Sequence, residues 1–272
     1  MNCKICNNQE NNIMHTVKEM MFGYRDKFQY LECSYCECLQ IVEIPENILK
    51  YYPENYYSFS TDPGKYYDKK VNIFFNKLFF KYPNNKFLRL FQNHSNIGYF
   101  EFLLGKITSD TKILDVGCGV GVLPYILKNA GFENASGVDP FIEKDIEYSN
   151  GLKIRKQYLH ELNEKFNIIT MNHSFEHMDE PLKILQNISN LLEENGTCII
   201  RIPTVSSYAW KHYGVDWVQL DAPRHFFLHS LKSIEFLADK TGFIIKNVEY
   251  DSTSFQLWGS EQYKNDIPLH HR

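Results

Sequence analysis

The spacing of hydrophobic residues changes along the chain and predicts regions of different structure. Residues 28–32 alternate between apolar and polar side chains, which is typical of a strand with one buried face. Between residues 69 and 80 the apolar residues recur every three or four positions, so they share one face of a predicted helix. A shorter helix is predicted over 96–104. From about residue 110 onward, short apolar runs alternate with helical patterns.

The alternating part predicts a doubly wound sheet. Apolar runs bounded by turn residues predict strands over 112–116, 135–138, 152–155, 166–171 and 197–202. Helices are predicted over 122–129, 181–192 and from the capping residue Ser230 to Lys240. A closing hairpin is predicted from 243–250 and 254–258. Because strands that alternate with helices pair in parallel, we expect an α/β fold with a mostly parallel, seven-stranded sheet.

Composition and charge narrow the classes of function. The chain has 272 residues, enough for one α/β domain with a small appendage. Its formal net charge is −4, which offers no basic field for a phosphate backbone, so we do not expect a nucleic acid partner. The sequence shows no apolar signal region and no apolar run long enough to span a bilayer. We therefore expect a cytoplasmic protein.

Two cysteine pairs near the N-terminus form one chemical signal. Two residues separate Cys3 from Cys6 and Cys33 from Cys36, and such a turn lets both thiolates bind one ion. Together the pairs supply the four sulfurs that structural zinc prefers, with no position left open for catalysis. The gap between the pairs is longer than usual, and Cys38 is an alternative ligand. The competing interpretation is a set of free or redox-active thiols.

These patterns predict four regions. Residues 1–45 are expected to form a zinc-ribbon-like domain, and residues 46–108 an aromatic-rich helical lid or linker. Residues 109–260 are expected to form the α/β domain, and 261–272 a polar tail. The Lys-flanked helices of the second region could instead lie on a membrane surface, but packing on the α/β domain is the simpler interpretation.

A glycine-rich turn after the first predicted α/β strand is the strongest signal in the chain. Gly117, Gly119 and Gly121 alternate with other residues, and Asp115 precedes them. This spacing differs from the dinucleotide fingerprint, whose third glycine would fall at Val122. A carboxylate at the end of the strand suits an ammonium group better than a pyrophosphate, and glycines let a ligand approach the backbone.

A second acidic residue, Asp139, follows the next predicted strand. A carboxylate at this place can accept hydrogen bonds from both hydroxyls of a ribose. Asp115 and Asp139 together therefore fit a nucleoside that carries an amino acid, as S-adenosylmethionine does.

At this point the chain resembles the class I S-adenosylmethionine-dependent methyltransferases. Residues 113–121 resemble the first motif of that family, 137–139 its second and 168–177 its fourth-strand motif. The resemblance covers about residues 95–258 and implies a Rossmann-like methyltransferase sheet. A nucleotide-binding fold without methyl transfer is the alternative.

The resemblance also implies residue roles. Tyr158 and Leu159 would flank the adenine, although this sequence lacks the acidic residue common there. Asn172 and His173, at the end of the fourth strand, would face the methyl-donor pocket. Together with the cysteine pairs, the chain further resembles bacterial methyltransferases of sugar and surface-polysaccharide pathways, through residues 56–59 and 221–227.

Methyl transfer to a hydroxyl or a carbon acid requires a base, and two histidines are candidates. His177 follows the fourth strand, and His225 lies in the long segment 203–229. A structural role for His177 has equal weight. Arg224 and the aromatic residues of that segment would suit the phosphate and the ring of a nucleotide-linked sugar, although each aromatic alone is better explained by packing.

The sequence thus predicts a methyltransferase that acts on an oxygen or carbon of a sugar-like small molecule. The first alternative is an RNA or protein methyltransferase whose zinc ribbon grips the polymer, but the ribbon has no Lys/Arg cluster. The second alternative is a non-catalytic interaction protein with a degenerate cofactor fold. The intact glycines and acidic residues of the motifs oppose it.

Overall fold

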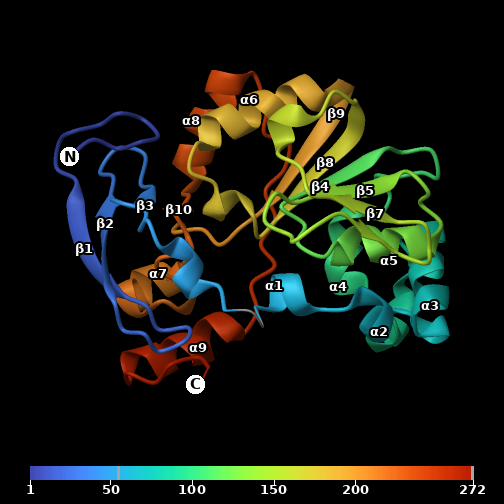
Figure 1. Ribbon diagram of the computed structural model, residues 1–272, viewed down its shortest axis with the longest axis horizontal. Helices are drawn as coiled ribbons and strands as arrows, with labels where there is room; N and C mark the ends of the chain where they lie inside the picture. Colours follow the sequence, from blue (N-terminus) through green and yellow to red (C-terminus); the bar gives the residue numbers. More distant parts are fainter. Residues whose placement is uncertain (54–55, 271–272) are drawn as a thin grey trace. The chain divides into compact units, whose positions relative to one another are not determined.

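The described part of the chain forms two compact units, each built from segments distant in sequence (Figure 1). A computed structural model describes residues 1–53 and 56–270, with only the backbone at 57 and 60. We call Met1–Pro53, His173–Ser189 and Arg201 onward the cysteine unit, and Glu54–Asn172 with Asn190–Ile200 the glycine-turn unit.

A six-stranded sheet forms the centre of the glycine-turn unit as far as the structure describes it. Its strands are β4 (Ile113–Val116), β5 (Ala135–Val138), β6 (Ile146–Glu147), β7 (Lys153–Arg155), β8 (Phe166–Asn172) and β9 (Leu192–Arg201). They lie in the order β6-β7-β5-β4-β8-β9. The pairs β4–β5, β4–β8 and β5–β7 are parallel, whereas β6–β7 is antiparallel. The predicted α/β sheet is present, but it is mixed.

The expectation of seven strands closed by a hairpin is wrong for the described residues. Residues 243–253 have no regular secondary structure, and α9 (Phe255–Lys264) replaces the second predicted strand. The buried residues of α9 are Gly259, Ser260 and Tyr263, spaced as on one helix face. The apolar residues of the first predicted strand are largely exposed, with Ile244 at 83%. A short apolar run cannot reveal whether a partner strand exists.

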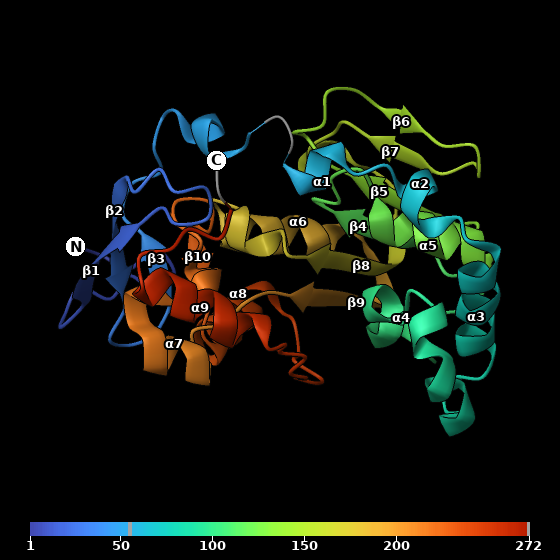
Figure 2. The ribbon, with the colours of Figure 1, turned by 90° about the horizontal axis from the view of Figure 1, so that it is seen from below.

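The short helices of this unit mostly precede the sheet in sequence, and the last two of them lie between its strands. They are α1 (Tyr57–Ser60), α2 (Pro63–Tyr67), α3 (Lys70–Lys81), η2 (Lys86–His94), α4 (Ile97–Phe100), η3 (Glu101–Leu103), α5 (Val122–Ala130) and η4 (Leu159–Glu161). Helix α5 packs on β4 and β5, while α3 and α4 pack on α5 (Figure 2). The helices predicted over 69–80 and 96–104 are confirmed. Their apolar faces supply Phe79, Phe100 and Leu103 to the core.

An antiparallel sheet organises the cysteine unit. Its strands are β1 (Ile13–Lys18), β2 (Lys27–Glu32), β3 (Leu39–Ile41) and β10 (Phe227–Leu228), in that order. The helices of this part of the chain are η1 (Ile48–Tyr51), η5 (Phe175–His177), α6 (Pro181–Leu191), α7 (Tyr208–Tyr213), η6 (Gly214–Asp216), η7 (Val218–Leu220), α8 (Leu231–Thr241) and α9.

Strand β10 brings a distant segment to the N-terminal sheet. Phe227 pairs with Gln40 and Leu228 with Leu39, and the hydroxyl of Tyr30 donates to the carbonyl of His225 at 2.8 Å. Trp210 and Trp217 pack in the same core. Residues 203–229 thus contribute two tryptophans to packing, the interpretation that the sequence favoured for each of these aromatics alone.

Helix α8 begins where the sequence predicted. The Oγ of Ser230 accepts a hydrogen bond from the backbone N–H of Ser233 and donates one to the carbonyl of Cys36.

In the described residues, no helix is both long and apolar enough to cross a membrane.

Candidate active site

Backbone geometry explains the glycines of the turn after β4. Gly117, Gly119 and Gly121 have φ angles of 66°, 54° and 80°, a region that other residues adopt at a cost. A Cβ on Gly119 would lie 2.2 Å from the carbonyl oxygen of Ser58, and the same carbonyl accepts from the N–H of Val120 at 3.1 Å. Segment α1 therefore packs directly on the turn, a contact that the sequence pattern did not reveal.

Asp115 is held by side chains of the neighbouring strand β8. It is 4% exposed, and its Oδ1 accepts from Thr170 Oγ1 at 2.6 Å and from Asn172 Nδ2 at 3.0 Å. The register pairs Asp115 with Thr170, so all three side chains meet at the carboxyl end of the sheet. Asn172 was predicted for this site, whereas Thr170 was missed because a Thr inside a strand carries no distinctive signal.

Asp139 fastens the glycine-rich turn from the other side. It is 5% exposed, and its Oδ2 accepts from the N–H of Gly119 at 2.8 Å while Oδ1 accepts from the N–H of Phe141 at 2.8 Å. Both predicted carboxylates thus lie at the carboxyl ends of adjacent parallel strands, where open α/β sheets bind ligands.

Tyr158 and Leu159 follow β7, the strand beside β5. Tyr158 is 52% exposed, with its ring stacked on His160, and Leu159 is buried. The position after β7 is at the same edge of the sheet as Asp139, whose N–H donates to the carbonyl of Arg155 at 3.0 Å. Adenine contacts by these two residues stay a prediction.

The four paired cysteines converge in the cysteine unit. The sulfurs of Cys3 and Cys36 are 3.6 Å apart, those of Cys6 and Cys33 are 3.5 Å apart, and all four lie within 4.8 Å of one another. Cys38, the alternative ligand, is outside this group, and its Sγ lies 3.8 Å from the carbonyl of Leu39.

Hydrogen-bond donors around Cys3 favour a thiolate at this residue. The N–H of Ile5 and the amide of Gln40 donate to Cys3 Sγ at 3.4 and 3.0 Å. The hydrogen bond with the Cys36 thiol lowers the pKa of Cys3 to about 4, although burial opposes this shift. Burial raises the pKa of Cys6 to about 11. Without a cation, four adjacent sulfurs cannot all be thiolates because their charges repel, and a divalent cation would remove that conflict.

His177 and His225 meet in the cysteine unit. Their ring centroids are 4.7 Å apart with an interplanar angle of 69°. The Nδ1 of His177 lies 2.8 Å from the carbonyl of Arg224, and that of His225 lies 2.8 Å from the carbonyl of Gln219. Because a carbonyl only accepts, Nδ1 carries a hydrogen in both rings, so in a neutral ring the lone pair is on Nε2. Burial lowers the pKa of His225 to about 4, so this imidazole is neutral at neutral pH.

Glu176 and His173 complete this group. Glu176 is fully buried, and His173 Nδ1 lies 3.6 Å from its Oε1. Burial alone would raise the pKa of Glu176, but the facing histidines His173, His177 and His225 lower it to about 2. The structure thus assigns His173 to the cysteine unit, together with the two candidate bases, while its neighbour Asn172 lies beside Asp115.

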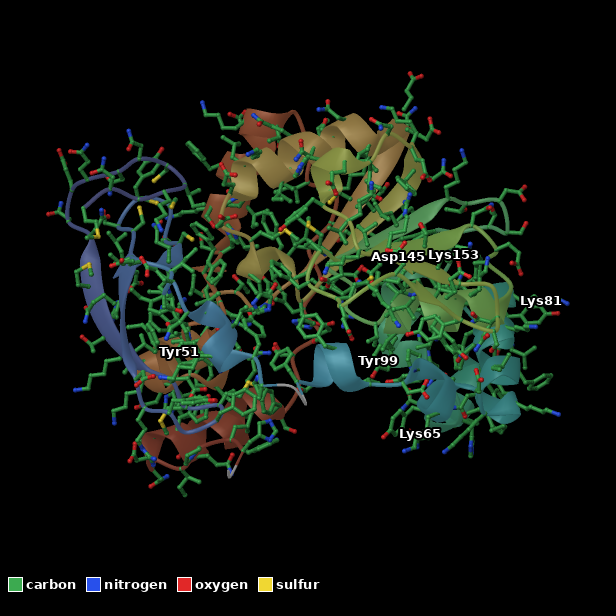
Figure 3. The ribbon with its side chains drawn as sticks, viewed as in Figure 1. Tyr51, Lys65, Lys81, Tyr99, Asp145 and Lys153 are labelled. Atoms are coloured by element: carbon green, nitrogen blue, oxygen red, sulfur yellow. The ribbon has the colours of Figure 1, made fainter. Side chains whose placement is uncertain are left out.

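Arg224 does not have the predicted role of a phosphate ligand. Its side chain is fully buried, and its guanidinium donates to Asp221 at 2.9 Å, to Glu19 at 3.0 Å and to the carbonyl of Tyr51 at 3.0 Å. Tyr51 ends η1 (Figure 3). The network anchors the backbone next to His225 because two carboxylates neutralise the cation inside the unit.

Comparison with known proteins identifies relatives of this chain. Residues 88–248 match a family model described as a methyltransferase domain. The ubiquinone biosynthesis O-methyltransferase of Haemophilus ducreyi is 30% identical over 145 residues, covering 46% of this chain and 61% of that protein. The enzyme of the same description from Histophilus somni is 26% identical over 202 residues, with coverages of 65% and 84%.

A solved structure is similar at a greater distance. Magnesium protoporphyrin IX methyltransferase of Synechocystis is 18% identical, with a TM-score of 0.45 over 71% of this chain and 95% of that one. Among the curated relatives, the first matches span only about three fifths of the relative's length.

Proposed function

The chain belongs to the family of methyltransferase domains, and on that premise we propose that it transfers a methyl group from S-adenosylmethionine to a small molecule. The observation that carries the proposal is the pair of buried carboxylates, Asp115 and Asp139, on either side of the glycine-rich turn. In the reaction, an acceptor oxygen or carbon forms a bond to the methyl carbon while the sulfonium bond breaks. The sulfur keeps the electron pair, which yields S-adenosylhomocysteine.

Each carboxylate suits one part of the cofactor. Asp115 would bind the ammonium of the amino-acid portion, and Asp139 would accept hydrogen bonds from the ribose hydroxyls. Asp139 now accepts from two backbone N–H groups, which also hold the turn in place. The absence of side chains at Gly117 and Gly119 would let the cofactor approach the backbone. Tyr158 would lie beside the adenine.

The cysteine group fits a structural Zn²⁺ ion. Cys3, Cys6, Cys33 and Cys36 offer the four-sulfur set, and the N–H groups directed at the sulfurs are the second-shell partners that thiolate ligands require. An ion held by four thiolates has no open position, so its contribution would be to the stability of the cysteine unit.

The acceptor that we propose is a hydroxyl or carbon of a sugar-like molecule, as the cysteine-pair methyltransferases of sugar pathways suggest. His225 and His177 would serve as bases, since each presents a lone pair on Nε2. The buried state of Arg224 removes the expected phosphate ligand, so a nucleotide portion of the acceptor has no identified partner. The curated relatives favour a second candidate, the hydroxyl of an intermediate of ubiquinone biosynthesis.

Cofactor binding is tested first, by calorimetric titration with S-adenosylhomocysteine. Asp115→Asn and Asp139→Asn should each weaken binding at least about tenfold, since a lost charged hydrogen bond costs roughly 1.5–3 kcal/mol. Asp145→Asn is the matched control, because Asp145 is exposed and Asn can still accept from the N–H of Lys156 (Figure 3). Equal affinities in all three variants would contradict the assignment.

The acceptor is tested by mass spectrometry with S-adenosylmethionine and two panels, one of free and nucleotide-linked sugars and one of hydroxylated precursors of ubiquinone. A sugar that gains one methyl group supports the first acceptor, and a methylated phenolic precursor supports the second. If the cofactor binds and neither panel is methylated, both acceptor classes are wrong.

A further inference from the structure

Three potential metal-ligating side chains meet in the cysteine unit, apart from the four cysteines. They are Glu176 and His177, both on η5, and His225, which lies between η7 and β10. One ligand atom from each lies within 4.8 Å of the others.

Glu176 is the unusual member of the group. Its side chain is completely buried, and within the described residues neither carboxylate oxygen has a hydrogen-bond partner. Two histidine nitrogens face this carboxylate, His173 Nδ1 and His225 Nε2, but they lie 3.6 and 3.9 Å from Oε1, too far for hydrogen bonds. Burying a carboxylate without a partner is costly, so native proteins pair such groups or bind a metal with them.

The two imidazoles are oriented as metal-bound histidines are. Both donate Nδ1–H to a backbone carbonyl at 2.8 Å, His177 to that of Arg224 and His225 to that of Gln219. This outer hydrogen bond fixes the ring and the tautomer, and it leaves the lone pair of Nε2 available for a cation. His177 is only half-buried, so a bound cation would keep positions accessible to a further oxygen ligand.

We propose that Glu176, His177 and His225 bind a divalent transition-metal cation at a site of their own. Two imidazoles and one carboxylate form the set found with Zn²⁺, Fe²⁺ and Mn²⁺ at sites with open positions. The carboxylate supplies charge to the buried group, and the cation supplies the partner that both oxygens lack. This site differs from the four-thiolate group in ligand chemistry. A bound cation would occupy both Nε2 lone pairs, so His177 and His225 could act as bases only in protein without that cation.

The test is a titration of the protein, loaded with one equivalent of Zn²⁺ for the cysteines, with Mn²⁺ alone, followed by electron paramagnetic resonance. Mn²⁺ prefers oxygen and nitrogen ligands to thiolates, so it reports on this site and not on the cysteines. We expect one Mn²⁺ per chain. Glu176→Gln and His225→Asn should weaken its binding at least about tenfold, since even the loss of an outer partner has that effect.

Glu180→Gln is the matched control, because Glu180 is an exposed carboxylate that forms an ion pair with the surface residue Lys183 at 2.9 Å. It should bind Mn²⁺ as the unchanged protein does. Because Glu176→Gln alters a buried group, His177→Gln at a half-buried position provides a second variant. Pulsed resonance should detect two coupled imidazole nitrogens in the unchanged protein and one in His177→Gln.

Two results would overturn the proposal. One is the absence of Mn²⁺, Fe²⁺ and Zn²⁺ binding beyond the ion held by the cysteines. The other is binding that persists unchanged in folded Glu176→Gln or His177→Gln, with no imidazole coupling in the resonance spectrum.

Discussion

Gly119 occupies the most restricted position of the glycine-rich turn. Two independent features exclude a Cβ at this position. The φ of 54° is strained for other residues, and a Cβ would clash with the carbonyl oxygen of Ser58. Gly98, in α4, has neither restriction, since nothing lies within 4 Å of the place a Cβ would take. The two glycines form a natural pair for substitution.

Gly119→Ala should destabilise the protein by at least about 2 kcal/mol, because the left-handed conformation and the clash with a backbone oxygen both oppose the methyl group. It should also weaken S-adenosylhomocysteine binding at least about tenfold. Gly98→Ala should be neutral or stabilising by up to about 1 kcal/mol, as expected in a helix. Urea unfolding and calorimetry measure both effects. A stable Gly119→Ala protein with normal affinity would contradict this account.

The buried side chain of His229 makes the free energy of unfolding depend on pH. It is fully buried between Phe175 and Phe227, its Nδ1 lies 3.1 Å from Ser233 Oγ, and its Nε2 has no partner in the described part of the chain. Burial lowers the pKa of His229 from 6.5 to about 4. The unfolded state therefore binds the proton more readily, and the stability present above pH 6.5 is lost as the pH falls toward 4.

The expected loss from this one group is about 3 kcal/mol across that window, at about 1.4 kcal/mol per pH unit. His229→Phe keeps an aromatic ring between the two phenylalanines and should reduce the slope of unfolding free energy against pH by about one proton. His160→Phe, which removes an exposed imidazole, is the control. Urea titrations between pH 7 and 4 measure the slope. Identical slopes for His229→Phe and the unchanged protein would refute the prediction.

At the scale of elements, the start of α8 is also a junction with the cysteine segment. Ser230 is buried, and its hydroxyl both caps the helix and donates to the carbonyl of Cys36. Ser207 caps α7 through the N–H of Trp210 at 3.1 Å and serves as a simple cap for comparison.

Ser230→Ala should cost about 2–4 kcal/mol, because it removes the cap and leaves a buried carbonyl with one partner fewer. Ser207→Ala should cost about 1 kcal/mol, the usual value for a cap alone. The midpoint of urea unfolding measures both. If the two variants lose equal stability, the bond to Cys36 adds nothing.

At the scale of the whole molecule, each unit is assembled from distant segments. The N-terminal sheet is completed by β10, and the same unit contains the cysteine group and the histidines. Removal of zinc should therefore destabilise the whole cysteine unit and not only the turns that contain the cysteines.

Chelation should release the Zn²⁺ ion held by the four cysteines and lower the melting temperature by at least about 10 °C, since structural zinc contributes directly to folding. Cys3→Ser should have the same effect. Cys198→Ala, a cysteine outside the group, should retain the ion. Metal analysis and calorimetry measure the outcome. A metal-free protein with an unchanged melting temperature would exclude a structural zinc site.

Local patterns determined a large part of this protein. Gly117, Gly119, Gly121 and their flanking strand and helix were predictable because backbone geometry and hydrophobic period act over a few residues. The sequence also identified the carboxylates at the strand ends and the paired cysteines, since their chemistry depends on short spacings. The proposed domain boundaries and the role of each site residue stay predictions.

Tertiary structure decided what no local pattern contains. The hairpin predicted from residues 243–258 is absent among the described residues, because an apolar period cannot state whether a partner strand is present. Arg224, a phosphate ligand by residue type, is a buried cation because Glu19 and Asp221 reach it in the folded chain. The unpaired carboxylate of Glu176 and its two imidazoles arise in the same way. Long-range packing sets which polar groups meet and which remain buried without a partner.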